Sequence, residues 1–71
     1  MGSDSEILLN TIEAAQFLRQ RARVLEAWRY RGVGPAYIRI SRSSVRYRRS
    51  DLFAFLDEMT VVPSRGREVA A

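Results

Sequence analysis

Two stretches in the first half of the chain carry apolar side chains at the spacing of a helix. The first covers about residues 11–18 and is formed by Ala14, Ala15, Phe17 and Leu18. Asn10 precedes this stretch, and Glu13 follows three residues later. An asparagine cap and a glutamate at this spacing can each accept a hydrogen bond from the other's backbone amide. We therefore expect a short helix over residues 11–18, with Asn10 as its N-cap.

A second helical pattern begins at Ala22, after a break of a few residues. Leu25 and Trp28 are three residues apart and so share one side of a helix. Gly32 is of the residue type that most often ends helices in a left-handed conformation. We expect the second helix over residues 22–31. Trp28 can also stack on a nucleic-acid base, but its spacing from Leu25 favours a place in the core.

The pattern then changes from helical spacing to alternation. Gly32-Val33-Gly34-Pro35 interrupts the helix, because proline lacks an amide hydrogen and glycines favour turns. Apolar and polar side chains alternate in residues 37–40 and 45–47, on either side of the polar segment 41–44, which predicts a two-stranded hairpin. An isolated hairpin is not stable in water. It must pack on the helices through Ile38, Ile40, Val45 or Tyr47.

Helical spacing returns in residues 50–59, where the apolar positions are Leu52, Phe55, Leu56 and Met59. The flanking segments 1–6 and 60–71 show no periodicity, so we expect them to be flexible and the folded domain to cover residues 7–59. Helix, tight break, helix, hairpin and helix is the order of a winged helix-turn-helix. The predicted fold class is α+β, with three helices and a two-stranded β-hairpin wing.

Composition excludes several classes of function. The 71 residues include neither Cys nor His, which rules out disulfides, thiol nucleophiles, imidazole bases and the commonest zinc ligands. Paired carboxylates and a phosphate-binding glycine loop are also missing, so we expect no enzyme, no cofactor and no metal site. The apolar runs are far shorter than the roughly 18 residues of a membrane-spanning helix. We expect a cytoplasmic protein without a membrane partner.

The positive charge of the chain indicates what kind of molecule it binds. The net charge is +4, and all twelve basic residues are arginine. A genome rich in G and C also favours arginine codons, so composition alone leaves two explanations open. The positions of the arginines decide between these two explanations, because seven of the twelve lie between Arg29 and Arg49, around the predicted hairpin. Guanidinium groups bind phosphates and the edge of guanine, so this cluster favours double-stranded DNA.

An ordered set of motifs extends over residues 8–56. It consists of Leu9-Asn10-Thr11-Ile12-Glu13-Ala14-Ala15, Leu25-Glu26-Ala27-Trp28-Arg29, Gly34-Pro35, Val45-Arg46-Tyr47-Arg48-Arg49-Ser50-Asp51-Leu52 and Phe55-Leu56. In these motifs the chain resembles the excisionase-like and AlpA-like branch of the MerR-type helix-turn-helix proteins, which includes recombination directionality factors. The turn Arg19-Gln20-Arg21-Ala22 departs from the family, whose members usually have a small and then an apolar residue followed by a serine-like cap.

The resemblance implies an accessory protein of a mobile element. Such a protein binds repeated DNA sites, shapes the DNA and directs a site-specific recombinase, or integrase, towards excision. A transcriptional regulator of a phage or mobile element on the same fold is the alternative. A protein-binding adaptor is disfavoured, because its second helix and hairpin would carry no charge.

The second helix has two sides on a helical wheel. The packing side holds Leu25, Trp28 and Arg29. The outward side holds Arg23, Glu26, Ala27 and Tyr30. The resemblance makes this the recognition helix, whose outward residues contact base edges in the major groove. The predicted DNA contacts of this helix are Arg21, Arg23, Glu26, Ala27, Tyr30 and Arg31.

These residues differ in what they can contact. Arg23 is the candidate base reader, with Arg21 beside it, and Tyr30 is better placed for a phosphate. Glu26 can accept a hydrogen bond from cytosine N4. An equally open interpretation is that Glu26 pairs with Arg29 or Tyr30 within the helix. For Arg23, the alternative is that its side chain is only solvated and contacts no base.

The hairpin supplies the remaining DNA contacts. Arg39 and Arg46 neighbour apolar residues and should face away from the core, while Arg42 lies at the tip with Ser43 and Ser44. A short tip with one arginine can enter a minor groove, where negative potential is concentrated. The alternative is that the hairpin is simply exposed and that its charge has no role in binding.

Two further regions leave alternatives open. Arg48 and Arg49 precede the third helix, where they can reach a phosphate or pair with Asp51. Phe53 lies off the apolar stripe of that helix, near Val61 and Val62, and either covers the rim of the core or contacts a protein. The resemblance suggests a neighbouring copy, in cooperative self-association on DNA, or a recombinase.

Overall fold

The computed structural model of this chain describes residues 8–63. Its elements are β1 (Leu8–Leu9), α1 (Thr11–Leu18), α2 (Ala22–Arg31), β2 (Ile38–Ser41), β3 (Ser44–Arg48) and α3 (Arg49–Met59). The bounds of α1 and α2 agree with those expected from the apolar pattern, and α3 begins one residue earlier. The expected flexible segments, 1–6 and 60–71, lie outside the described residues apart from Thr60–Pro63, which forms neither helix nor strand.

The start of α1 follows from its capping residues. The Asn10 Oδ1 atom accepts a hydrogen bond from the Glu13 amide at 2.8 Å, and the Glu13 Oε1 atom accepts one from the Asn10 amide at 2.9 Å. The capping box expected from the sequence is confirmed. Such a cap stabilises a helix by about 1 kcal/mol, which matters for a helix of only eight residues.

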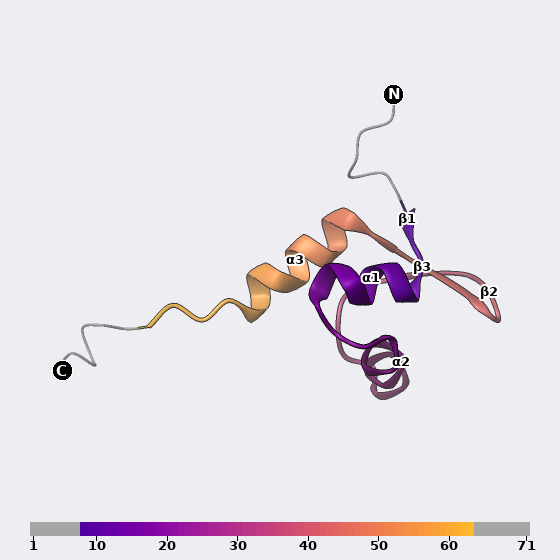
Figure 1. Ribbon diagram of the computed structural model, residues 1–71, viewed down its shortest axis with the longest axis horizontal. Helices are drawn as coiled ribbons and strands as arrows, with labels where there is room; N and C mark the ends of the chain where they lie inside the picture. Colours follow the sequence, from indigo (N-terminus) through magenta and orange to yellow (C-terminus); the bar gives the residue numbers. More distant parts are fainter. Residues whose placement is uncertain (1–7, 64–71) are drawn as a thin grey trace, which may run out of the picture.

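The turn between α1 and α2 is three residues long, although its sequence departs from the family pattern. Arg19 adopts a left-handed conformation with φ of 59°, and its amide donates to the Gln16 carbonyl at 3.1 Å. The Gln20 amide donates to the Ala15 carbonyl at 2.8 Å. These bonds satisfy carbonyls that the end of a helix leaves free. The chain turns sharply, and α2 runs across α1 rather than alongside it (Figure 1).

The sheet has one strand more than the predicted hairpin. Its three strands are antiparallel in the order β1-β3-β2, so β3 lies in the middle. In β1, Leu8 lies opposite Arg48 and Leu9 lies opposite Tyr47. The apolar residues ahead of α1 therefore bring the beginning of the domain to the wing (Figure 1).

The register of β2 against β3 shifts between Arg39 and Ser41. Arg39 lies opposite Val45 and Ser41 lies opposite Ser44, which leaves Ile40 as an extra residue. A bulge of this kind breaks the alternation of side chains. Ile40 is 58% exposed, so of the four possible anchors it is not one that packs on the helices. Arg39 lies opposite Val45, and its side chain is exposed, as expected for a residue outside the core.

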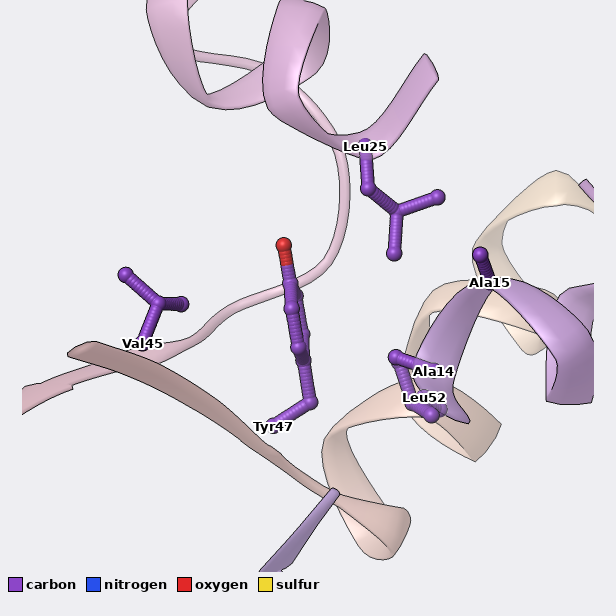
Figure 2. Close-up of a cluster of buried hydrophobic side chains, with 6 residues drawn as sticks. All are labelled: Ala14, Ala15, Leu25, Val45, Tyr47 and Leu52. Atoms are coloured by element: carbon purple, nitrogen blue, oxygen red, sulfur yellow. The ribbon is translucent and has the colours of Figure 1, made fainter. Parts of the chain in front are cut away.

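The core is small and draws on all three helices and on β3. Its buried members are Ala14, Ala15, Leu25, Val45, Tyr47 and Leu52. Figure 2 shows the Tyr47 ring rising from β3 between Val45 on one side and the side chains of the helices on the other. Tyr47 is fully buried, so the hairpin is anchored through this ring and Val45. The core thereby fixes the wing relative to α2.

Candidate nucleic-acid interface

The outward side of α2 is free of packing. Arg23, Glu26 and Ala27 are exposed, and Tyr30 is 93% exposed. Leu25, on the other side of the helix, is fully buried. The burial of α2 therefore confirms the helical wheel. Arg21 and Arg31, at the two ends of the helix, are exposed as well.

Trp28 belongs to the packing side. Its ring centroid lies 5.4 Å from that of Phe55 on α3, with an angle of 51° between the ring planes. The side chain is partly buried against the core cluster. The structure thus supports the core interpretation of Trp28 over base stacking.

Arg29 joins α2 to the wing. Its Nη1 atom donates to the Tyr47 hydroxyl at 2.7 Å and to the Thr11 hydroxyl at 3.3 Å. The guanidinium carbon also lies 5.7 Å from the centre of the Tyr37 ring, within the range of a cation–π contact. A buried hydroxyl without a partner would cost free energy, so this bond makes the burial of Tyr47 possible. The helical wheel predicts that Arg29 lies on the packing side, but it does not predict the hydroxyl groups and the ring that Arg29 contacts.

Glu26 has no partner on its own helix. Arg29 is engaged with Tyr47 and Thr11, and the exposed Tyr30 makes no hydrogen bond to the Glu26 carboxylate. The ion pair found within residues 8–63 joins Arg48 to Asp51 instead. Within residues 8–63, no hydrogen bond or ion pair joins Glu26 to Arg29 or Tyr30.

The tip of the wing is a short exposed turn between β2 and β3. Arg42 and Ser43 are exposed and Ser44 is half-buried. The Arg39 Nη1 atom donates to the Arg42 carbonyl across this turn at 3.3 Å, and its guanidinium carbon lies 5.7 Å from the centre of the Tyr37 ring. Arg39 therefore braces the tip, while the Arg42 side chain makes no hydrogen bond to the rest of the described chain.

The other arginines near the wing have partners. Arg46 is half-buried, and its Nη1 atom donates to the Val45 carbonyl at 2.8 Å. Arg48 lies 3.4 Å from the Asp51 carboxylate, an exposed pair of the kind that contributes little to stability. The Arg49 guanidinium carbon lies 5.8 Å from the centre of the Phe17 ring. The Asp51 partner foreseen for this region is thus taken by Arg48 and not by Arg49.

The α3 side of the molecule exposes apolar surface. Phe53 is 54% exposed, and its ring meets Phe17 edge-on at a centroid distance of 5.2 Å. Val61 and Val62 are 84% and 79% exposed. Phe53 thus covers part of the rim of the core, and the rest of its ring remains accessible.

Neither a metal centre nor a membrane span was found between Leu8 and Pro63. No group of three or more Asp or Glu side chains in this range could hold a metal ion. The helices of this range are too short and too polar to cross a membrane.

The family model of a helix-turn-helix domain matches residues 8–60. Searches of curated proteins and of solved structures gave no match. The matched range begins at β1 and ends one residue after α3, so it contains every helix and strand described above.

Proposed function

The chain belongs to the family of helix-turn-helix domains, which bind DNA, and on that premise we propose that it is an excisionase-like accessory protein. In this role it binds repeated sites, shapes the DNA and directs a site-specific recombinase towards excision. The observation that carries the proposal is the free outward side of α2, followed in the chain by a hairpin with an exposed arginine at its tip.

In the proposed complex α2 occupies the major groove. Its exposed residues Arg21, Arg23, Glu26, Ala27, Tyr30 and Arg31 form the contact set. Arg23 reads a base, since arginine can donate two hydrogen bonds to guanine O6 and N7. Tyr30 and Arg31 lie in the last turn, nearer to the phosphates. The packing side of the helix holds α2 on the core and takes no part in contact.

The hairpin occupies the adjacent minor groove or follows its edge. Arg42 makes the closest contact, together with Ser43 and Ser44. Arg39, Arg46 and Arg48 are held by bonds within the domain and add positive potential along the phosphates. Narrow minor grooves attract arginine for electrostatic reasons, whatever the base sequence.

One copy reads too little DNA to find a unique site. A single domain of this kind buries roughly 600 to 1,000 Å² of surface and contacts only a few base pairs. Several copies on neighbouring sites, or a copy and a recombinase, are therefore required. Phe53, Val61 and Val62 are exposed apolar residues outside the proposed DNA contacts, and we assign the protein contact to them.

DNA binding is tested first, by the salt dependence of affinity. Each phosphate contact releases about 0.9 counterions, so the logarithm of the binding constant should fall linearly with the logarithm of salt concentration. A flat response between low and physiological salt would show that phosphates are not bound.

The recombination role is tested with the recombinase and the attachment-site DNA of the element that carries the protein. We expect added protein to raise the yield of excised product and to leave integration unchanged or reduced. A change in transcription from the neighbouring promoter without any effect on excision would identify a transcriptional regulator.

Self-association is tested by gel-shift titration on one site and on an array of sites. Phe53→Ser, or removal of residues 60–71, should reduce cooperativity on the array more than affinity for one site. Because Phe53 also contacts Phe17, a thermal melt must accompany the Phe53 variant. Independent filling of the array by the unmutated protein would exclude the assembly.

A further inference from the structure

Glu26 is an unusual residue on the outward side of α2. It is the only acidic residue of this helix, whose sequence is ARVLEAWRYR. It is exposed, and a helical wheel places it about 60° from Arg23 and about 40° from Tyr30, on the side proposed to face DNA. A carboxylate near phosphates is repelled, so this residue weakens DNA binding unless it meets a hydrogen-bond donor.

Nothing within the described domain neutralises the Glu26 carboxylate. Arg29, one turn further along the helix, donates to the Tyr47 and Thr11 hydroxyls. Arg23, one turn before, forms no ion pair with Glu26. Within residues 8–63 the ion pair that forms joins Arg48 and Asp51. The oxygen atoms of Glu26 are therefore available to a donor outside the protein.

The major groove offers such donors on only two bases. Guanine presents the acceptors N7 and O6, and thymine presents the acceptor O4 and a methyl group. Adenine presents its N6 amino group beside the acceptor N7, which repels a carboxylate. Cytosine presents the N4 amino group alone. A carboxylate in this groove is therefore most favourable opposite cytosine.

We infer that Glu26 is a specificity-determining residue that selects cytosine and rejects guanine and thymine. The inference rests on the proposed function, in which α2 lies in the major groove. Arg23 lies three residues earlier, about 4.5 Å along the helix axis. Base pairs are 3.4 Å apart, so the two side chains reach the same or neighbouring base pairs. The recognised site then contains a guanine for Arg23 at or next to the cytosine for Glu26.

The test is selection of binding sequences from random double-stranded DNA by the unmutated protein and two variants. The unmutated protein should select cytosine at one position, with other bases bound roughly 5- to 150-fold more weakly. Glu26→Gln should change that position to adenine, because an amide pairs with adenine N6 and N7. Glu26→Ala should lose the preference at that position alone and bind random DNA more tightly than the unmutated protein.

Glu58→Gln is the matched control. Glu58 is exposed on α3, so its replacement changes the net charge by the same amount outside α2. This variant should select the same sequences as the unmutated protein. Thermal melts should agree among all four proteins, since neither glutamate side chain forms a hydrogen bond or ion pair within residues 8–63.

The outcomes separate this inference from the function on which it rests. If all four proteins bind DNA with salt-sensitive affinity and select the same sequences, Glu26 does not read a base and the inference is wrong. Weaker binding of Glu26→Ala to random DNA would also overturn it, because the carboxylate would then not oppose the phosphates. If no protein binds any DNA, the proposed function fails and the inference fails with it.

Discussion

Helix α2 and the hairpin both carry arginines that we propose contact DNA, but the domain holds some of them more firmly than others. On α2, Arg23 has no hydrogen bond to the rest of the described chain. In the hairpin, Arg39 and Arg46 donate to backbone carbonyls of the hairpin itself. Arg42 at the tip of the hairpin is as free as Arg23, while Arg39 and Arg46 beside it are held in place. The two free arginines therefore differ by location: Arg23 lies on the helix proposed to read bases, and Arg42 lies on the turn proposed to bind the backbone.

The largest expected effect concerns Tyr47, the residue through which the two regions are joined. Replacing this fully buried ring in Tyr47→Ala should destabilise the domain by about 3 to 5 kcal/mol, close to the whole stability of a small domain. Tyr47→Phe keeps the ring but removes the acceptor of the Arg29 bond and should cost about 1 kcal/mol. Urea denaturation measures both. Equal stability of Tyr47→Phe and the unmutated protein would show that the Arg29 bond does not hold α2 to the wing.

The next effect concerns the loop that leads from α2 to the hairpin. Gly34 has φ of 95°, and an added Cβ would lie 2.9 Å from the Trp28 Cβ atom. Gly34→Ala should therefore cost about 2 to 4 kcal/mol, from backbone strain and from the displaced tryptophan. Gly32→Ala is the control, since φ is 74° there but no atom lies within 4 Å, and it should cost about 1 kcal/mol. Similar costs for both would mean that the approach to Trp28 does not position the loop.

The third effect concerns DNA binding by one arginine from each region. Arg23→Ala should lose about 1 to 3 kcal/mol of binding free energy on the specific site and little on random DNA. Arg42→Ala should weaken both and lower the salt slope by about one counterion. Fluorescence anisotropy at several salt concentrations measures these quantities. Equal losses of Arg23→Ala on both DNAs would place Arg23 on the backbone and remove the distinction between the regions.

The smallest effect concerns the turn that places α2. Arg19 adopts a left-handed conformation that glycine adopts without steric cost. Arg19→Gly should therefore raise the free energy of unfolding by about 0.5 to 1 kcal/mol, as part of the strain is offset by the greater freedom of glycine in the unfolded chain. A thermal melt detects this shift. Destabilisation would indicate that the arginine side chain makes a contribution larger than the strain of its backbone.

The elements that the sequence predicted well carry local signals. The Asn10 cap begins α1, Gly32 ends α2, and the spacing of Leu25 and Trp28 identifies the packing side of α2. Each signal involves residues within about one turn of helix, so it is visible without knowledge of the fold. The exposure of the outward side of α2 follows from the same spacing.

The features that escaped prediction depend on contacts between distant residues. The two residues of β1 are too few to show alternation, and only the partner strand β3 defines them. The extra residue Ile40 depends on the register between two strands. The bond between Arg29 and Tyr47 joins residues that no spacing rule connects. Whether Glu26 has a partner on its own helix is not predictable from spacing either, because it depends on the distant residues that Arg29 binds.

The pairing of β1 with β3 has a consequence for how the domain forms. Leu8 lies at the beginning of the described chain and its partner Arg48 lies beyond both helices and β2. A contact between residues so far apart requires a long loop to close, and such contacts slow folding. The sheet cannot be completed until a ribosome has released the chain beyond Arg48, so the α1–α2 pair emerges without the Tyr47 ring on which it packs. The domain should therefore fold as one cooperative unit after β3 has left the ribosome, and not helix by helix during synthesis.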